Sequence, residues 1–309
     1  MIEAAGLRKV YGDLVAVEGA TFEARPGEIF GLLGPNGAGK TTTLNCISGL
    51  FAPTAGRLLV NGFDVVRQGR SARRSMGVVP QELALYEELT AAENLDYWGG
   101  LQGLAGGDLK RRIGEVLESL GLQDRAKEPV KRYSGGMKRR LNFACGIVHK
   151  PKVLLLDEPT VGVDPQSRVR LLELIRQLAA EGVCVLYTTH YMEEAEALCD
   201  RLAIMDHGRL IAQGTLAELR ALVGERELLS LSGSWDPERV RTALAQIEGV
   251  EVLKAEQGLL TLAAPGAAAR LAGIFAAISA AGAEIREATL HQPSLEALFI
   301  RLTGKELRD

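Results

Sequence analysis

The chain of 309 residues is 47% apolar and 24% charged, which is the composition of a globular protein with room for two domains. Its formal net charge is -3, so charge gives no reason to expect nucleic acid or an anionic membrane surface as the main partner. No apolar run approaches the ~18–20 residues that cross a bilayer. The strand-like start with Glu3 and Arg8 is not that of a signal peptide.

Cysteine usage points to a reducing compartment. The four cysteines lack C-x-x-C or metal-ligand spacing, and three of them lie in apolar surroundings. We therefore expect reduced, packed thiols in a cytosolic protein. The four are Cys46, Cys145, Cys184 and Cys199.

The first elements expected along the chain are two short strands, residues 2–10 and 14–24, joined by a turn at residues 11–13. Tyr11 in that turn has two interpretations. It is either an edge-strand aromatic packed on its neighbours or a flat platform for a purine ring, since aromatic faces stack well on bases.

A glycine-rich segment, residues 34–41, follows an apolar strand and opens a helix. Its spacing is G-x-x-x-x-G-K-S/T, the pattern of a phosphate-binding loop. Glycines let backbone N–H groups turn toward an anion, and the helix N-terminus adds its positive dipole end. Lys40 can reach the β- and γ-phosphates, and the Thr41 hydroxyl is placed for Mg²⁺. The sequence therefore predicts a nucleotide site here.

The helix after this loop is expected to carry Leu44, Ile47 and Leu50 on one face and to end near Gly49 and Pro53. A strand over residues 56–60 follows. Four arginines then form either a solvated helix face or a partner-binding patch. They are Arg67, Arg70, Arg73 and Arg74.

Residues 76–79 read as a short strand that leads to Gln81. Gln81 is either a turn residue or a side chain that binds Mg²⁺ and senses the γ-phosphate. The pattern from residue 89 to about 150 is helical, with Thr90 and Glu93 spaced as a capping box. In this block residues 134–136, Ser-Gly-Gly at a helix start, form either an anion site or a plain N-cap.

Two later strands end in groups that can do chemistry. Residues 153–156 are apolar and run into Asp157 and Glu158, as in a buried parallel strand whose carboxyl end faces a ligand. Asp157 can hold Mg²⁺ through water, and Glu158 can polarise an attacking water. A helix over residues 171–180 and a strand over 183–188 follow, and the strand leads to His190.

The tail predicts a small separate domain. Its expected order is β-α-β-β-α-β followed by a helix over residues 295–302, which is the order of a ferredoxin-like unit. We expect either a dimerisation or stability module or a ligand sensor.

Taken in order, these motifs resemble the ATPase subunit of ABC transporters over residues 2–220. The resemblance implies an α/β fold, a P-loop NTPase with an N-terminal antiparallel β subdomain and a helical insertion at about 82–150. Residues 1–220 would form this domain, and residues 225–309 the α+β ferredoxin-like accessory domain.

The resemblance also implies roles for the site residues. Adenine would stack on Tyr11, with Val17 packing nearby. The phosphate contacts would be Gly34, Pro35, Asn36, Gly37, Ala38, Gly39, Lys40, Thr41 and Thr42. The Mg²⁺ ligands would be Thr41, Gln81 and Asp157. The catalytic residues would be Glu158 as general base for water, His190 at the γ-phosphate, Lys40 and Gln81.

Active members of this family are head-to-tail pairs with two ATPs between them. By resemblance, Ser134, Gly135 and Gly136 of one copy would meet the ATP held by the other, and Asp164 would lie across the same interface. The chain departs from the usual Leu-Ser-Gly-Gly-Gln signature at Tyr133 and Met137, and Met137 cannot offer the amide hydrogen bonds of Gln.

This version of the signature looks like that of bacterial drug- and sodium-exporter ATPases, whose membrane subunits are separate chains. The residues at 293–299 resemble the end of those exporters' accessory domain. The resemblance implies a second copy or a homologous subunit as partner, permease chains, and a place at the cytoplasmic face of the membrane. Tyr86 and Glu87 are candidate permease contacts. The alternatives are a soluble ABC-type ATPase acting on ribosomes or DNA, and a nucleotide-sensing regulator.

Overall fold

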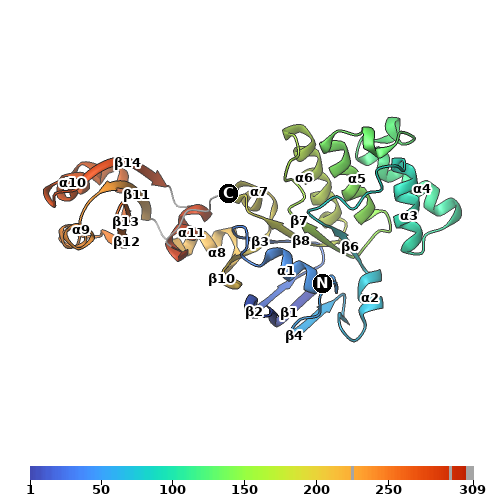
Figure 1. Cartoon of the computed structure of the whole chain (residues 1–309), viewed down its shortest axis with the longest axis horizontal. Coiled ribbons are helices and arrows are strands. Elements are labelled where there is room, and N and C mark those ends of the chain that lie inside the picture. Colours follow the sequence, from blue (N-terminus) through green and yellow to red (C-terminus); the bar gives the residue numbers. More distant parts are fainter. Residues whose placement is uncertain (224–225, 292–293, 304–309) are drawn as a thin grey trace. The chain divides into compact units, whose positions relative to one another are not determined.

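The computed structural model describes residues 1–223, 226–291 and 294–303. The chain forms two compact units, Met1–Ile211 and Ala212–Asp309, coloured blue to yellow and yellow to red in Figure 1. The domain division expected at 220–225 stays a prediction. Residues 225 and 293, which the sequence analysis placed at the start of the accessory domain and near its end, lie outside the described ranges.

The first unit begins with a four-stranded sheet in the order β2-β1-β4-β5. The two predicted strands at the start of the chain pair antiparallel, with Ile2 opposite Ala24 and Tyr11 opposite Leu14. Gly12, with φ 57°, supplies the left-handed turn between them. The strands are β1 (Ile2–Tyr11), β2 (Leu14–Ala24), β4 (Ala55–Val60) and β5 (Phe63–Asp64).

The second sheet has six strands in the order β10-β9-β3-β8-β7-β6. Its middle strands β3, β8 and β7 are wholly buried, as continuous apolar runs in a parallel sheet should be. Residues of both sheets share one hydrophobic core. The strands are β3 (Ile29–Leu33), β6 (Met76–Val79), β7 (Val153–Asp157), β8 (Cys184–Thr189), β9 (Arg201–Asp206) and β10 (Arg209–Thr215).

The helix after the glycine loop is shorter than predicted. α1 (Lys40–Ile47) ends before Gly49, whose φ of 74° leaves the helical region. Leu44 and Ile47 are buried as expected, but the prediction for Leu50 was wrong, since it is 67% exposed. The four arginines on or just before α2 (Gly69–Arg74) are exposed, as expected of a solvated face.

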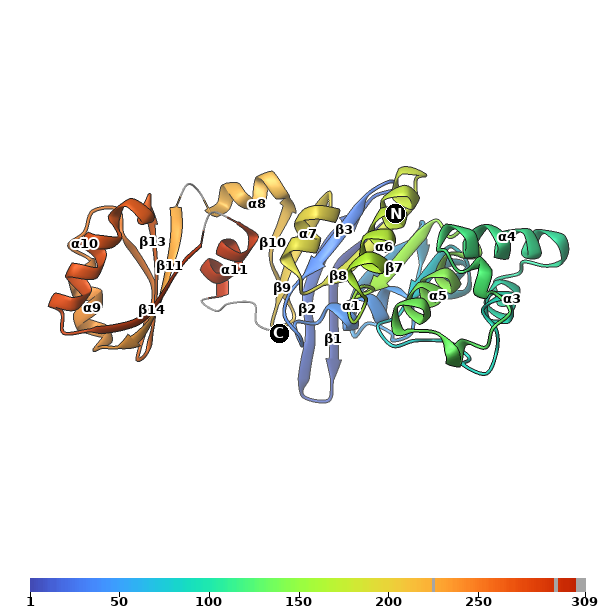
Figure 2. The ribbon, with the colours of Figure 1, turned by 90° about the horizontal axis from the view of Figure 1, so that it is seen from above.

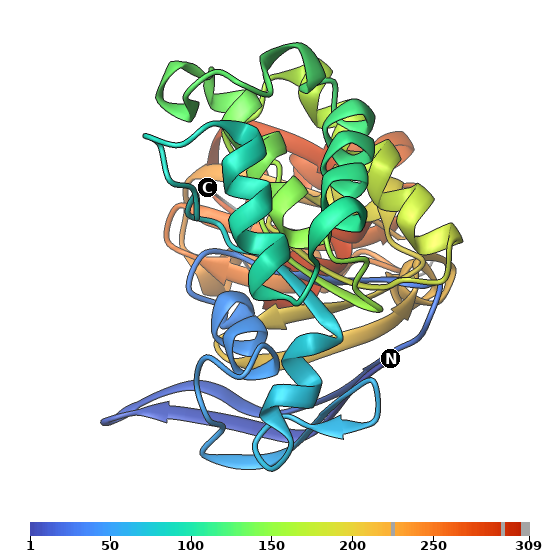
Figure 3. The same cartoon turned by 90° about the vertical axis from the view of Figure 1, so that its right-hand side faces the viewer.

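The predicted helical block is confirmed, with α3 (Ala91–Leu101), α4 (Gly106–Ser119) and α5 (Gly135–Ile147) gathered at one end of this unit (Figure 3). Thr90 and Glu93 form the expected capping box at the start of α3. Helix α6 (Pro165–Ala180) starts six residues earlier than predicted, because Asp164 caps it and Pro165 suits the first helical position.

The second unit contains the predicted ferredoxin-like order. The sheet is antiparallel in the order β12-β13-β11-β14. Helices α9 and α10 cover one face of it and share a core with its strands (Figure 2). The elements are β11 (Arg226–Ser234), α9 (Pro237–Leu244), β12 (Glu251–Glu256), β13 (Leu259–Pro265), α10 (Ala267–Ala280) and β14 (Glu284–His291).

Two further helices of this unit, α8 (Leu216–Val223) and α11 (Leu295–Thr303), pack against each other. The Arg301 side chain, on α11, donates to the Leu222 carbonyl at 3.0 Å. Across the described ranges of the chain, no helix combines the length and apolarity needed to cross a membrane.

Candidate functional site

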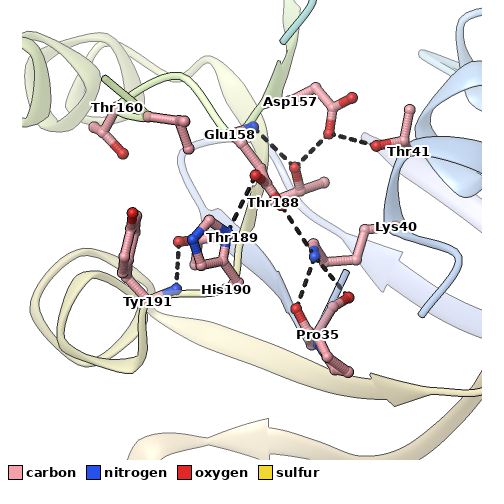
Figure 4. A network of polar contacts seen from close by, with 12 residues as sticks. Pro35, Lys40, Thr41, Asp157, Glu158, Thr160, Thr188, Thr189, His190 and Tyr191 are labelled. Atoms are coloured by element: carbon pink, nitrogen blue, oxygen red, sulfur yellow. Dashed lines mark hydrogen bonds and ion pairs between the residues drawn. The ribbon is translucent and has the colours of Figure 1, made fainter. Parts of the chain in front are cut away.

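The candidate site lies where parallel strands of the second sheet end together. β7 pairs with β8 so that Asp157 lies opposite Thr188, and β3 pairs with β8 so that Leu33 lies opposite Thr189. Gly34 follows β3, and its N–H donates to the Thr189 carbonyl at 3.3 Å. The glycine loop, the two carboxylates and His190 therefore meet at one edge of the sheet (Figure 4).

The glycine loop requires glycine at its last turn. Gly39 has φ 105°, and a Cβ there would lie 2.5 Å from the Ala16 carbonyl oxygen of β2. Only glycine fits both the backbone angle and the close approach. Helix α1 starts at the next residue, so its unpaired N–H groups and its positive dipole end belong to this loop, as an anion site needs.

Lys40 is buried, and Figure 4 shows its side chain between Pro35 and Glu158. Its ammonium Nζ is 2.7 Å from the Gly34 carbonyl oxygen, 3.0 Å from that of Pro35 and 3.0 Å from Glu158 Oε1. These three acceptors match the three donors of an ammonium group. A phosphate at the loop would compete with Glu158 for this cation.

Glu158 is held from several sides. Its Oε2 is 3.1 Å from His190 Nδ1, and its backbone N–H donates to Thr188 Oγ1 at 3.0 Å. Its φ of 45° is uncommon for a residue with a side chain. The imidazole nitrogen and the carboxylate oxygen are within ion-pair distance, and the carboxylate can only accept there. Lys40 and His190 together fix where this carboxylate points.

Asp157 faces different partners. Its Oδ1 accepts from Thr188 Oγ1 at 2.7 Å and from Thr41 Oγ1 at 3.2 Å (Figure 4). Burial raises the pKa of Asp157, and the Glu158 charge acts in the same direction, while the two hydroxyls oppose the shift. A hydroxyl and a carboxylate oxygen converge here. Such hard oxygen donors fit Mg²⁺, which commonly takes one or two protein ligands beside substrate phosphates.

No group of three or more His, Cys, Asp or Glu side chains forms a metal cage within the described ranges. An ion held by Thr41, Asp157 and phosphate oxygens needs no such cage. The donor set at this edge therefore fits Mg²⁺ as a companion of a nucleotide.

Tyr11 lies at the end of β1, and its side chain is 39% exposed. Its ring meets Phe51 edge to face at 5.9 Å, and the Lys9 ammonium lies 4.8 Å from its centre. Desolvation raises the pKa of its hydroxyl. Both interpretations of Tyr11 fit this geometry. Val17 is fully buried in the core, and its expected place beside a nucleotide stays a prediction.

Gln81 is exposed just beyond β6. Its backbone carbonyl accepts from Arg139 Nη1, and Nη2 of the same guanidinium donates to the Val161 carbonyl at 3.0 Å. Asn142, one turn further along α5, donates to the Pro80 carbonyl and accepts from the Ala84 N–H. Helix α5 thus holds the segment of Gln81.

The second predicted anion site, residues 134–136, is a helix start as expected. Ser134 caps α5 by accepting from the Met137 N–H at 3.3 Å. A Cβ on Gly136 would lie 2.6 Å from Asp164 Oδ2, so Gly136 packs against the residue that caps α6. No hydrogen bond or ion pair in the described ranges joins residues 134–136 to Lys40 or Glu158.

Sequence reasoning missed Thr188, whose hydroxyl joins the site's two acidic residues by donating to Asp157 and accepting from the Glu158 N–H. Pairing the ends of the two predicted strands would have found it. The ion pair of Arg168 with Glu194, at 2.8 Å, was also missed, because helix periodicity gives no sign that a surface-patterned Glu is buried.

The chain is similar to ATP-binding proteins of known name. A family model described as "ABC transporter" matches residues 17–161. The chain is 43% identical to the linearmycin resistance ATP-binding protein of Bacillus subtilis, with 100% of both chains covered. It is 42% identical to the Nod factor export ATP-binding protein I of Ralstonia nicotianae, covering 98% of this chain and 94% of that protein.

Solved structures agree as well. A dimeric ATP-binding cassette in a post-hydrolysis state, bound to ADP and phosphate, matches with a TM-score of 0.65 and 26% identity. The match covers 70% of this chain and 99% of that one.

Proposed function

The chain belongs to the ATP-binding subunits of ABC transporters, and we propose that two copies of it, or one copy and a homologous subunit, hydrolyse ATP between them to power an exporter. The observation that carries this is the cluster at the sheet edge, where Lys40, Asp157, Glu158 and His190 meet the glycine loop. Groups whose chemistry suits binding phosphate, holding a metal ion and activating water lie together there.

The chemistry is positioning and electrostatic stabilisation. The loop amides and Lys40 take the charge of the phosphates, so Lys40 exchanges Glu158 for the γ-phosphate as ATP binds. Glu158, still held by His190, then orients the attacking water and accepts its proton. Thr41, Asp157 and Gln81 would hold Mg²⁺, which would supply positive charge at the phosphates. The base of adenine stacks on Tyr11.

In this proposal the nucleotide site formed by the phosphate loop of one copy is completed by the start of α5 from the other copy. The start of α5 is a capped helix N-terminus formed by Ser134, Gly135 and Gly136. In the described ranges, no hydrogen bond or ion pair joins it to the phosphate loop of the same copy. A second copy placed head to tail brings this helix start to the γ-phosphate. Asp164, packed on Gly136, lies at the same contact.

The names of the relatives support export, since one relative is named for antibiotic resistance and another for Nod factor export. We infer a place at the cytoplasmic face of the membrane, bound to separate permease chains. The exposed Tyr86 and its neighbour Glu87 lie on the segment between Gln81 and α3 and are candidate permease contacts.

One experiment tests both the dimer and the exporter. The tagged Glu158→Gln variant keeps the side chain's size but cannot accept the proton of water, so with Mg-ATP we expect a stable dimer with very slow turnover. Purified from native membranes, it should bring integral membrane proteins with it. Companions limited to ribosomes or DNA would contradict the exporter, and wild-type turnover would remove Glu158 from its role.

A further inference from the structure

A second polar cluster lies directly behind His190. Glu194, on α7 (Met192–Leu198), is buried with only 2% of its surface exposed. Its Oε2 accepts from Tyr187 Oη at 2.7 Å and from Thr189 Oγ1 at 3.0 Å. Its Oε1 is 2.8 Å from Nε of Arg168, on α6.

Burying a carboxylate costs several kcal/mol unless a cation and hydrogen bonds compensate. Here one guanidinium and two hydroxyl donors supply this compensation. Burial raises the pKa of Tyr187 well above its ordinary value, so its hydroxyl stays protonated and donates. No role in the chemistry proposed above uses the buried Glu194 or its partner Arg168, whose side chain is 34% exposed.

The residues before and after His190 in the chain both contact this cluster. Thr189, which donates to Glu194, also accepts from the Tyr191 N–H at 2.9 Å. The Arg168 guanidinium lies 5.4 Å from the centre of the Tyr191 ring, and that ring is 4.0 Å from the His190 ring. The residues before and after His190 are therefore both tied to the Arg168–Glu194 pair (Figure 4 shows Thr189, His190 and Tyr191).

The same pair reaches the segment that follows Glu158. The Arg168 backbone N–H donates to the Asp164 carbonyl at 2.9 Å, one turn earlier in α6. Thr160 Oγ1 is 3.4 Å from Tyr187 Oη. One ion pair thus joins the start of α6 to the loop that carries His190.

From this geometry we propose that Arg168 and Glu194 are positioning residues for hydrolysis, which hold His190 in register with the start of α6. This inference rests on the proposed function. A displacement of Asp164 and α6, as when a second copy docks there, is carried through Arg168 to Tyr191 and His190, and so to the Glu158 carboxylate. In the described ranges, no hydrogen bond or ion pair joins the side chain of either residue to the glycine loop or to Glu158.

The test separates binding from turnover. Arg168→Gln and Glu194→Gln remove the ion pair but keep hydrogen-bonding groups of similar size. We expect kcat to fall by about 10–100-fold, the scale of a small misplacement of catalytic groups. The KM for ATP should stay within about 2-fold, because the phosphate loop is intact. The double variant should lose no more than either single variant, and Arg168→Lys should restore part of kcat.

The chain offers a matched control. Arg201 and Glu28 are 3.0 Å apart with side chains 25% and 10% exposed, and the Arg201 guanidinium lies 5.5 Å from the Phe30 ring. Glu28 precedes β3, whereas the glycine loop follows β3, so this pair is at the other end of the strand. Arg201→Gln should lower thermal stability without changing kcat per folded molecule.

The results of these measurements distinguish failure of the positioning role of Arg168 and Glu194 from failure of the proposed function. If Arg168→Gln and Arg201→Gln both lower stability alone, with kcat unchanged, Arg168 and Glu194 have a structural role and the inference is overturned. Additive losses in the double variant would overturn the coupling. A wild-type protein without ATP hydrolysis would instead contradict the proposed function.

Discussion

At the scale of single residues, the two adjacent carboxylates at the end of β7 have separate environments. Glu158 lies against Lys40 and His190, whereas Asp157 accepts hydrogen bonds from the hydroxyls of Thr41 and Thr188. Successive residues of a strand point to opposite sides, and the positive φ of Glu158 turns its side chain further. Two neighbouring acids can therefore do different work.

Asp157 gives a prediction with a definite sign. Its pKa is raised in the folded protein, so the folded state binds the proton more tightly than the unfolded chain. The ionised carboxylate therefore costs folding free energy that is absent below the unfolded pKa and fully present above the folded one. Asp157→Asn should raise stability at pH 7, on the order of 1 kcal/mol or ~2–4 °C in Tm.

Thermal unfolding across pH measures this. The difference in Tm between Asp157→Asn and the wild type should shrink as the pH falls through the raised pKa of Asp157 toward about 4. With Mg-nucleotide present the order should reverse, because the wild type keeps the carboxylate for Mg²⁺ and gains more ligand stabilisation than the variant. An asparagine variant less stable than the wild type at pH 7 without nucleotide would refute the burial argument.

The residues of the site could be predicted from their chemistry, but their contacts could not. Lys40, Asp157, Glu158 and His190 each stand at a glycine loop or a strand end, where local pattern suffices. The Lys40–Glu158 and Arg168–Glu194 pairs join residues 118 and 26 positions apart (158 − 40 and 194 − 168). Such pairs depend on strand register and helix packing, which no local pattern encodes.

At the scale of elements, helix α5 joins the Ser-Gly-Gly start to the segments around it. Its first turn packs on Asp164 through Gly136, and its second holds Gln81 through Arg139. A displacement of this helix must therefore move both neighbouring segments with it.

Gly136 tests this packing. A methyl group at position 136 would meet Asp164 Oδ2 at 2.6 Å, and that carboxylate is held by its bond to the Ser167 N–H. Gly136→Ala should destabilise the protein by about 1–3 kcal/mol, as overpacking does, measured by the urea midpoint of unfolding.

Gly135, next to it, is the matched control. A Cβ there meets nothing within 4 Å, so Gly135→Ala should gain up to about 1 kcal/mol from helix propensity. Equal effects of the two substitutions would mean that the contact of Gly136 with Asp164 carries no energy.

Element type followed closely from the sequence in both units. Buried runs such as residues 153–157 and the β-α-β-β-α-β order of the tail gave the correct strands and helices. The errors in the predicted elements lie at the ends of helices, because capping residues determine where a helix starts and stops. α1 stops before Gly49, which exposes Leu50, and α6 begins at Pro165 under the Asp164 cap.

At the scale of the whole molecule, the chain presents its phosphate loop and its Ser-Gly-Gly helix start as separate features. The loop's lysine is satisfied within its own copy, and Ser134 bonds only within α5 in the described ranges. Under the proposed function, binding of a nucleotide is therefore a property of one copy, while hydrolysis needs two.

The most direct test is Ser134→Arg, measured for ATP binding in dilute solution and for turnover at high protein concentration. The bulky charge should block the contact with a second copy's phosphates. We expect ATP affinity close to that of the wild type and turnover lower by about 100-fold or more. Ser71→Arg, on the exposed face of α2, should change neither. Equal loss of binding and turnover in Ser134→Arg, or wild-type turnover, would contradict a site shared between two copies.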